Sequence, residues 1–380
     1  MSVIILKDVD ISTLANDALK NTLGESATII PENLSGGIVD SGVAIANANA
    51  YRNFLDNLLV ATSKYIFRFR AYESKAPNVL RDNSEYGRLI QKIRSKMPPA
   101  RKNQSWDLQD NTSYDDNIFR ANEIEVKIFK DRVAFEIQKS ITNDQIKDAF
   151  TNATELGNFV SMVFGEVQNR LTVDLDNLIF YAINNYMGEL IHNTKQIKLL
   201  TMFKAEVDPA STLTSDDCIY DSKFLTYASS VINEYKSLMG RYSELFNLES
   251  YPTFTPDSML HVLLLSKFRQ AIEMFAQSST FHDEYIKLPY GEETPFWMNV
   301  GDMSLKDKSS IDITTSEGHT VKASYIVAFM FDHDALGVNH NNPSVETKYI
   351  RSGQFTNYWY KEDLGVFNDF AENALVFTLE

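Results

Sequence analysis

The chain has 380 residues, 44% of them hydrophobic and 12% aromatic, so it can bury a substantial core and form two or three domains. Its net charge of -15 argues against a protein whose main task is gripping nucleic acid, because phosphate affinity comes from clustered Lys and Arg. The only cysteine, Cys218, excludes an internal disulfide and is interpreted as a buried side chain without a role. The absence of a signal-like start and of long apolar runs predicts a soluble, unexported protein.

The first 40 residues are predicted to be an extended arm. They show no sustained periodicity, and they contain Pro31, Gly36 and Gly37. From residue 41 to residue 60, apolar residues recur at spacings of three and four, which predicts a helix.

A long projecting loop is predicted after this helix. In residues 64–70 aromatic residues alternate with Arg68 and Arg70, and residues 124–129 show the same period, so both segments are predicted to be strands. The polar insertion between them is predicted to contain a short helix over residues 84–96. An insertion of this length is unusual in a compact monomer and indicates a function or a partner.

The charge is divided unevenly along the chain. Residues 61–102 contain 11 basic and 3 acidic side chains, a net charge of +8, whereas residues 131–380 contain 19 and 35. A basic stretch on its own is more often a solvated loop than a binding site. It becomes informative if the chain assembles with copies of itself.

The strongest local signal is a long amphipathic helix over residues 152–190. Asn152 and Glu155 form a capping box, and apolar residues then recur at helical spacing. At 1.5 Å per residue the helix would be about 58 Å long, which is also typical of a coiled coil or a helix bundle. A strand over residues 133–138 and a short helix near residues 143–150 are predicted before it.

The remainder of the chain is predicted to be mixed. Helices are expected near residues 222–240 and 255–275, and strands near residues 310–313, 323–331 and 354–377. This mixture favours an α+β fold over a helix bundle.

The sequence predicts no active site, cofactor or metal site. It has no phosphate-binding loop, dinucleotide fingerprint, nucleophile elbow or paired zinc-binding histidines. Two polar clusters were considered as metal sites, and each lacks a complete ligand set, so both are interpreted as structural. They consist of Asp332, His333, Asp334 and His340, and of Asp107, Asp110, Asp115 and Asp116.

The order of these elements resembles the major capsid proteins of tailed bacteriophages with the Hong Kong 97 fold. Short stretches of the sequence are similar to the capsid proteins of short-tailed phages related to the phi29 group, both in the insertion and at the end of the chain. The matching text is Ala76-Pro77-Asn78-Val79-Leu80, Met97-Pro98-Pro99, Ser105-Trp106-Asp107-Leu108, Thr356-Asn357-Tyr358-Trp359-Tyr360 and Ala371-Glu372-Asn373-Ala374-Leu375.

The resemblance implies a domain organisation. It comprises an N-terminal arm and helix (1–60), an extended loop (61–130), a peripheral domain with a spine helix (131–194), an axial domain (195–350) and C-terminal strands that return to the peripheral domain (351–380).

The implied function is a non-enzymatic subunit of an icosahedral phage head. Its hexamers and pentamers would enclose double-stranded DNA without sequence-specific binding, aided by a separate scaffolding protein and a portal. Assembly would take place in the host cytoplasm, without a membrane and without covalent crosslinks. The alternative with the same fold is the shell of an encapsulin-type compartment, and an unrelated soluble protein is the other alternative.

In this family the extended loop lies across the neighbouring subunit and its spine helix. We therefore expect basic loop residues to face acidic residues of the neighbour's spine helix; the competing hypothesis is that the basic loop grips DNA. The basic set is Arg68, Arg70, Arg88, Lys92, Arg94 and Lys96, and the acidic set is Glu155, Glu166, Asp174 and Asp176. Phe164 is expected in the core beneath the spine helix.

Overall fold

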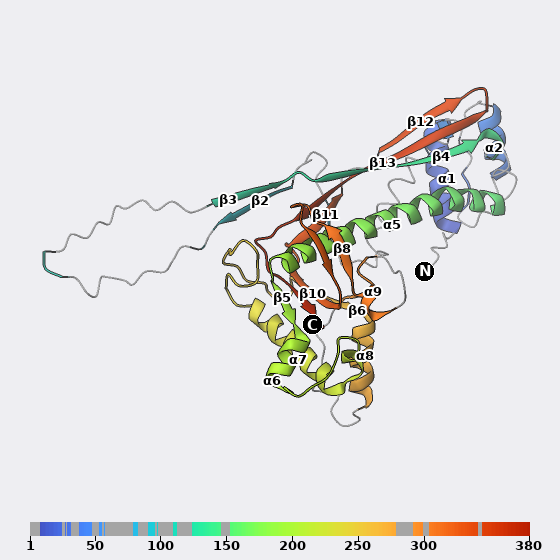
Figure 1. The fold of residues 1–380 in the computed structure, drawn as a ribbon. Helices are drawn as coiled ribbons and strands as arrows, with labels where there is room; N and C mark the ends of the chain where they lie inside the picture. Colours follow the sequence, from blue (N-terminus) through green and yellow to red (C-terminus); the bar gives the residue numbers. More distant parts are fainter. Residues whose placement is uncertain are drawn as a thin grey trace.

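The computed structural model describes residues 8–24, 27, 29–31, 38–47, 53–54, 57, 79–82, 90–95, 97, 109–111, 124–145, 153–278, 292–298, 304–340 and 344–380. They form two five-stranded sheets, two smaller two-stranded ones and a set of helices, which is the predicted α+β class (Figure 1). None of the helices in these ranges is long and apolar enough to cross a membrane.

The N-terminal segment contains a helix where we predicted an extended arm. Helix α1 (Asp8–Leu23) buries Ala15, Ala18 and Leu19 on one face. The prediction was wrong because small residues dominate this face, and alanines give a weak hydrophobic period. Helix α2 (Ile38–Asn47) confirms the start of the helix predicted over residues 41–60.

The predicted long helix is confirmed as α5 (Ala153–His192), whose 40 residues span about 60 Å at 1.5 Å per residue. It runs through the middle of the molecule, from the end where α1 and α2 lie to the globular body (Figure 1). Buried residues recur along its second half from Leu171 to Leu190. The side chain of Phe164 lies outside the described residues.

The first large sheet is organised around β13 (Phe355–Asn368). One edge of β13 pairs with β4 (Arg132–Thr142), which confirms the strand predicted over residues 133–138. The other edge pairs first with β12 (Ser344–Ile350) and then with β11 (Leu336–His340), and β1 (Leu80–Asp82) adds in parallel to β11.

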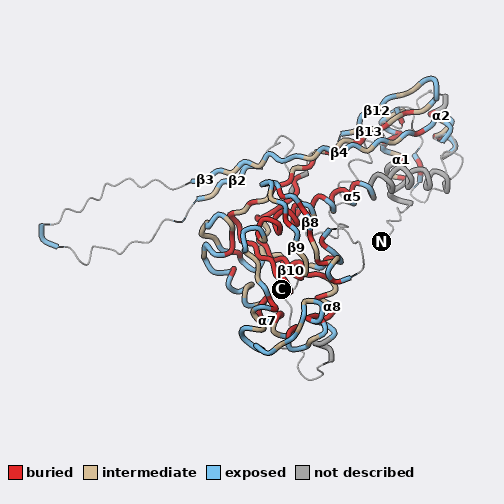
Figure 2. The backbone as a smooth tube through the Cα atoms, viewed as in Figure 1, coloured by how far each residue is buried: buried red, intermediate tan, exposed pale blue. Residues whose placement is uncertain are grey.

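The second large sheet lies in the body and carries much of the core. Its order is β5 (Gln196–Lys198), β14 (Ala374–Thr378), β10 (Ile326–Asp332), β6 (Leu260–Leu265) and β7 (Glu292–Thr294). Every residue of β10 and β14 is buried, so this sheet is covered on both faces (Figure 2).

Helices surround this sheet at the lower end of the body in Figure 1. They are α6 (Leu199–Glu206), a short 3-10 helix (Cys218–Tyr220), α7 (Ser222–Met239), α8 (Ser266–Ser278) and α9 (Leu305–Lys308). Helix α7 was predicted. The helix predicted over residues 255–275 is wrong in its first half, because a continuous apolar run cannot distinguish a buried strand from a helix, and β6 occupies it.

A hairpin of β8 (Ile311–Thr314) and β9 (Thr320–Ala323) packs closely on α5. At Gly188 a Cβ atom would come within 2.9 Å of Thr315 Cγ2, so the helix and the hairpin approach closely only because no side chain is there. The strand predicted over residues 323–331 divides at Tyr325, whose φ is 63°, into β9 and β10.

The second two-stranded sheet, which we call the ribbon, consists of β2 (Ile90–Ser95) and β3 (Ile124–Phe129). It projects from the body, and in Figure 2 it is coloured as exposed and intermediate. Strand β3 was predicted, whereas the helix predicted over residues 84–96 is wrong. Exposure alternates along β2 with a period of two, and its pairing with β3 supplies the backbone hydrogen bonds. The strand predicted over residues 64–70 lies outside the described residues.

Candidate interaction surfaces

The two faces of the ribbon differ sharply in chemistry. Because side chains alternate along a strand, the antiparallel register places Lys92 opposite Lys127 on one face and Ile93 opposite Val126 on the other. The face that contains Ile93 is apolar and exposed. Its large residues and their exposed fractions are Ile93 (66%), Ile124 (65%), Val126 (47%) and Ile128 (50%).

The basic face of the ribbon is held against the body by carboxylates. Lys92 Nζ lies 2.9 Å from Asp369 Oδ2 and 2.6 Å from Glu372 Oε1. Arg94 Nη2 lies 2.7 Å from Glu372 Oε1 and also pairs with Asp369. Lys127 Nζ is 3.2 Å from Asp369 Oδ1 and also pairs with Glu249. We call these six residues the root cluster; they are Lys92, Arg94, Lys127, Glu249, Asp369 and Glu372.

Asp369 is the most deeply buried member of the root cluster. Its side chain is fully buried, whereas that of Glu249 is 41% exposed. Burial by itself raises the pKa of Asp369, but the positive charges of Lys92, Arg94 and Lys127 outweigh burial, so the pKa lies below its ordinary value. Asp369 is therefore a carboxylate anion at neutral pH.

The turn that carries Asp369 and Glu372 is fixed to the core from several sides. The buried hydroxyl of Tyr186, on α5, donates to the Asp369 carbonyl at 3.2 Å and to the Glu372 carbonyl at 3.0 Å. The Asp369 N–H donates to the carbonyl of Ala335 at 2.7 Å, and the Leu248 N–H donates to that of Phe370 at 2.9 Å. These hydrogen bonds hold Asp369 and Glu372 in fixed positions at the base of the ribbon.

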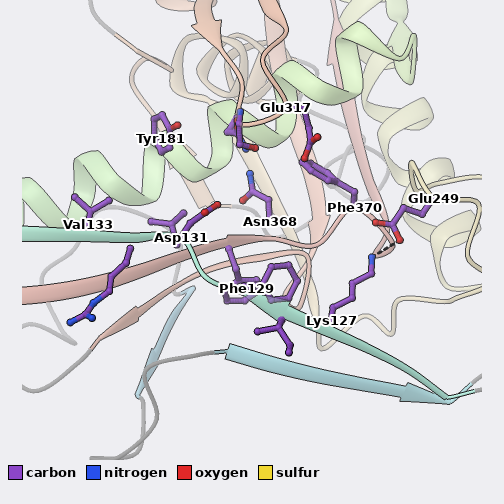
Figure 3. Close-up of a pocket in the computed structure, with 15 residues that line it drawn as sticks. Lys127, Phe129, Asp131, Val133, Tyr181, Glu249, Glu317, Asn368 and Phe370 are labelled. Carbon is purple, nitrogen blue, oxygen red and sulfur yellow. Dashed lines mark hydrogen bonds and ion pairs between the residues drawn. The ribbon is translucent and has the colours of Figure 1, made fainter.

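A cleft of about 660 Å³ opens beside the ribbon base, between α5, the β3–β4 connection and the end of β13 (Figure 3). Phe129 packs on Phe367 with ring centroids 5.3 Å apart. The buried Oδ1 of Asn368 has no hydrogen-bond partner among the described residues. The lining is mixed and consists of Lys127, Ile128, Phe129, Asp131, Arg132, Val133, Tyr181, Asn185, Glu249, Ser316, Glu317, Val366, Phe367, Asn368 and Phe370.

Helix α5 also exposes apolar side chains. Val173 is 48% exposed and Tyr181, which lines the cleft, is 46% exposed. They are eight residues apart, so they are about 80° apart around the helix axis. Within the described part of the chain, they are exposed apolar side chains in addition to those on the apolar face of the ribbon.

Four of the six basic residues predicted to bind a neighbouring subunit lie outside the described residues: Arg68, Arg70, Arg88 and Lys96. The other two, Lys92 and Arg94, pair with acidic residues of their own chain in the root cluster. Their role between subunits stays a prediction, because contacts within one chain do not test it.

The four acidic residues lie on α5, where the side chains of Glu155 and Glu166 are outside the described part. Asp174 is buried and accepts from Arg170 of the same helix at 3.0 Å, and Asp176 is half-buried. The predicted contact of these residues with a neighbour stays untested as well.

Sequence reasoning missed the acidic half of the root cluster. Asp369 and Glu372 lie more than 240 residues from the basic residues that they bind. A local signal did exist in β2: Lys92 and Arg94 are two residues apart, so a strand places both on one face.

The residues considered for metal binding form other contacts where they are described. His333 Nδ1 lies 3.0 Å from His261 Nε2, and burial raises the pKa of Asp332. Within the described ranges, no group of three or more His, Cys, Asp or Glu could hold a metal ion. Asp110 is exposed, whereas Asp107, Asp115, Asp116 and the His340 side chain are not described. Burial raises the pKa of Cys218 to about 12.

Comparisons with known proteins agree with this architecture. A family model for Phi29-like phage major capsid proteins matches residues 15–378. Among solved structures, a chain in the capsid of Staphylococcus phage Andhra has a TM-score of 0.51 and 12% identity, covering 80% of this chain and 83% of that chain. A chain in a bacteriophage P68 head fibre and inner core protein structure gives 0.47 and 9%, covering 82% and 86%. No curated protein sequence matches.

Proposed function

This chain belongs to the Phi29-like phage major capsid protein family, and from this premise we propose how its copies join to form a head. It is a structural subunit of a phage head, with the Hong Kong 97-like fold that its sequence resembles. The family match favours the phage head over the encapsulin alternative. As a member of a capsid family, the chain assembles with copies of itself and is a component of the virion.

The apolar face of the ribbon is proposed to be a contact surface for a second copy of the chain. Its four exposed aliphatic residues are the observation that supports this most directly, because a contiguous apolar surface in water favours association. The opposite, basic face is occupied by the chain's own carboxylates. A second subunit can therefore cover the apolar face without breaking the root cluster.

The surface that receives the ribbon is proposed to be the exposed side of α5, with Val173 and Tyr181, beside the cleft. A ribbon that binds a different surface of the next copy makes a head-to-tail contact, and such contacts close into rings when the rotation allows it. This geometry fits hexamers and pentamers.

The head is proposed to enclose double-stranded DNA and to be assembled in the host cytoplasm with a separate scaffolding protein and a portal. The acidic excess of residues 131–380, with 35 acidic and 19 basic side chains, supports this cargo. A wall of like charge lets DNA pack densely without adhering to it.

The test is to substitute Val126→Glu or Ile93→Glu in the purified chain and to examine assembly by negative-stain microscopy. A charge on the apolar face should abolish closed particles and leave the melting temperature of the subunit unchanged, because both side chains are exposed. Lys223→Glu, on the exposed surface of α7, is the control and should assemble normally. Normal particles from both ribbon variants would contradict the proposal.

The role predicted for the remaining basic residues needs a separate test. Reversing Arg88 and Lys96 should slow assembly, and raised salt should weaken wild-type assembly, because exposed ion pairs are screened within about 8 to 10 Å. Empty shells that form at the normal rate but fail to retain DNA would support the competing hypothesis that the loop grips DNA.

A further inference from the structure

We infer that Asp369 is the positioning residue of the ribbon: it fixes the direction in which the ribbon leaves the body and so presents the apolar face to the neighbouring subunit. The part that concerns the neighbour rests on the proposed function. The part that concerns the ribbon's direction rests on contacts within one chain and can be tested without assembly.

The ribbon carries a charge pattern that disfavours it as a free hairpin. Lys92 and Lys127 are directly opposite each other on one face, and Arg94 is two residues along on the same face. Like charges at directly opposite positions destabilise a strand pair. Glu125, opposite Arg94, is the only acidic residue in the two strands, so three positive charges need carboxylates from elsewhere.

The body provides those carboxylates, and Asp369 is central among them. Within the described part of the chain, it is the acidic residue that pairs with all three of Lys92, Arg94 and Lys127. Glu372 pairs with two of them and Glu249 with one. Because both strands of the ribbon are bound to this single carboxylate, its position determines the position of both.

Two further contacts make the direction specific. The guanidinium carbon of Arg94 lies 5.4 Å from the centre of the Tyr251 ring, and Lys92 Nζ donates to the carbonyl of Asp334 at 3.1 Å. These groups lie on different segments of the body. The basic face therefore makes several contacts of defined geometry, which a non-specific attraction to negative charge would not provide.

The turn that holds Asp369 is itself immobilised. Tyr186 donates to the carbonyls at both ends of the turn, and Tyr186 lies on α5 with its hydroxyl buried. The direction of the ribbon is therefore set relative to α5, which also exposes the surface proposed to receive the ribbon of another copy. In every subunit, the ribbon and the surface proposed to receive a neighbour's ribbon are therefore both positioned relative to α5.

The test compares Asp369→Asn with Asp363→Asn by amide hydrogen exchange in the unassembled subunit. Asp363 lies on β13, six residues before Asp369, but its pair with Arg132 is more than one-third exposed on both sides, so it is a matched control. Removing one partner of a buried ion pair should raise exchange in β2 and β3 by about 100-fold, whereas β10 and β14 should keep their protection. The control should leave both regions unchanged.

A second variant separates electrostatic positioning from a local packing defect. Asp369→Asn leaves three cations facing Glu372 and Glu249, and adding Lys92→Met restores two cations to two carboxylates. The double variant should recover at least about tenfold of the lost protection if the cluster acts through charge. No recovery, or wild-type exchange in the ribbon of Asp369→Asn, would overturn the inference.

Microscopy of the same proteins tests the consequence for assembly. Asp369→Asn should form few closed particles, and the double variant should form more. Closed particles in normal yield from a subunit with a released ribbon would overturn the role of ribbon direction in assembly. If Val126→Glu and Ile93→Glu form normal particles, the proposed contact fails, while the exchange data still decide whether Asp369 positions the ribbon.

Discussion

The ribbon and the β10 region of the body sheet use apolar residues in opposite ways. Strand β10 lies between β6 and β14 in its sheet, and all of its side chains are buried. In the ribbon the apolar face is exposed while the charged face meets the body. Strand β10 contributes to the stability of one chain. The side chains on the apolar face of the ribbon are 47–66% exposed, so they contribute little to that stability, and we expect them to act mainly between chains. Mutations on the two surfaces should therefore separate folding from assembly.

The largest effect on folding is expected from Phe329→Ala in β10. Phe329 is fully buried, with ring centroids 4.8 Å from Phe331 and 6.1 Å from Tyr186. Removing the ring leaves a cavity, so the free energy of unfolding should fall by about 3 to 5 kcal/mol, measured by denaturant titration. Ile93→Ala in the ribbon should change it by less than about 0.5 kcal/mol. Equal losses for the two variants would remove the distinction between the surfaces.

A smaller loss is expected from Tyr186→Phe, which leaves the ring in place. Burial raises the pKa of Tyr186 well above its ordinary value, so its hydroxyl remains a donor at any ordinary pH. Without it, two carbonyls of the turn lose their donor, and unfolding should become easier by about 1 to 3 kcal/mol. Exchange in the ribbon should rise as well, which a defect confined to the body would not produce.

Acid should release the ribbon before it unfolds the body. The folded-state pKa of Asp369 is lowered from its ordinary value of 3.8, so its ion pairs are fully formed above that value and are lost as the pH falls through the lower one. Asp332 has the opposite sign: burial raises its pKa, so protonation on acidification favours the folded state. The melting temperature of the whole subunit combines these two opposite effects of pH. The release of the ribbon therefore has to be measured at the ribbon itself.

Spin labels at Gln91→Cys in the ribbon and Glu234→Cys on α7 provide that measurement, since both positions are exposed. The native Cys218 is fully buried, with a pKa of about 12, and should resist labelling. The distribution of distances between the labels should widen below pH 4 and narrow again on return to pH 7. A width that stays constant until the body itself unfolds would contradict this expectation.

The smallest effect is expected from Asp363→Asn. Its pair with Arg132 is exposed by 38% and 35% at the two side chains, so water and salt already screen it. The free energy of unfolding should change by less than about 1 kcal/mol. A loss as large as that of Phe329→Ala would show that exposed pairs contribute more to this sheet than their burial suggests.

How far the sequence predicts the fold depends on the range of the interactions involved. Helices α5 and α7 were predictable because their apolar periods repeat over several turns. Strand β2 was not, because its two isoleucines, Ile90 and Ile93, are three residues apart, a spacing that also fits a helix, and its partner β3 begins 29 residues after β2 ends. Helix α1 was missed because the small side chains of Ala15 and Ala18 give only a weak hydrophobic period.

The candidate surfaces were less predictable than the fold. The charge of the loop segment was visible in the sequence, but the partners of Lys92 and Arg94 are in a turn near the C-terminus, and only tertiary structure brings them together. The exposed face of the ribbon has the same alternation as a strand that faces a core. Alternation gives the period of a strand but not which of its faces meets the body.

The geometry of β13 also determines how the subunit bears mechanical load. From Phe355 to Gly365 this strand is paired with β4 in an unbroken register of eleven residue pairs, and it then leads directly into the turn that Tyr186 holds. Antiparallel hydrogen bonds are perpendicular to the strands, so tension along β13 would load those bonds in shear, together and not one after another. A force applied to the end of β13 near α1 and α2 would thus reach the body as tension along the backbone of this strand. The root cluster, which follows β13 directly, would be the first set of contacts under load.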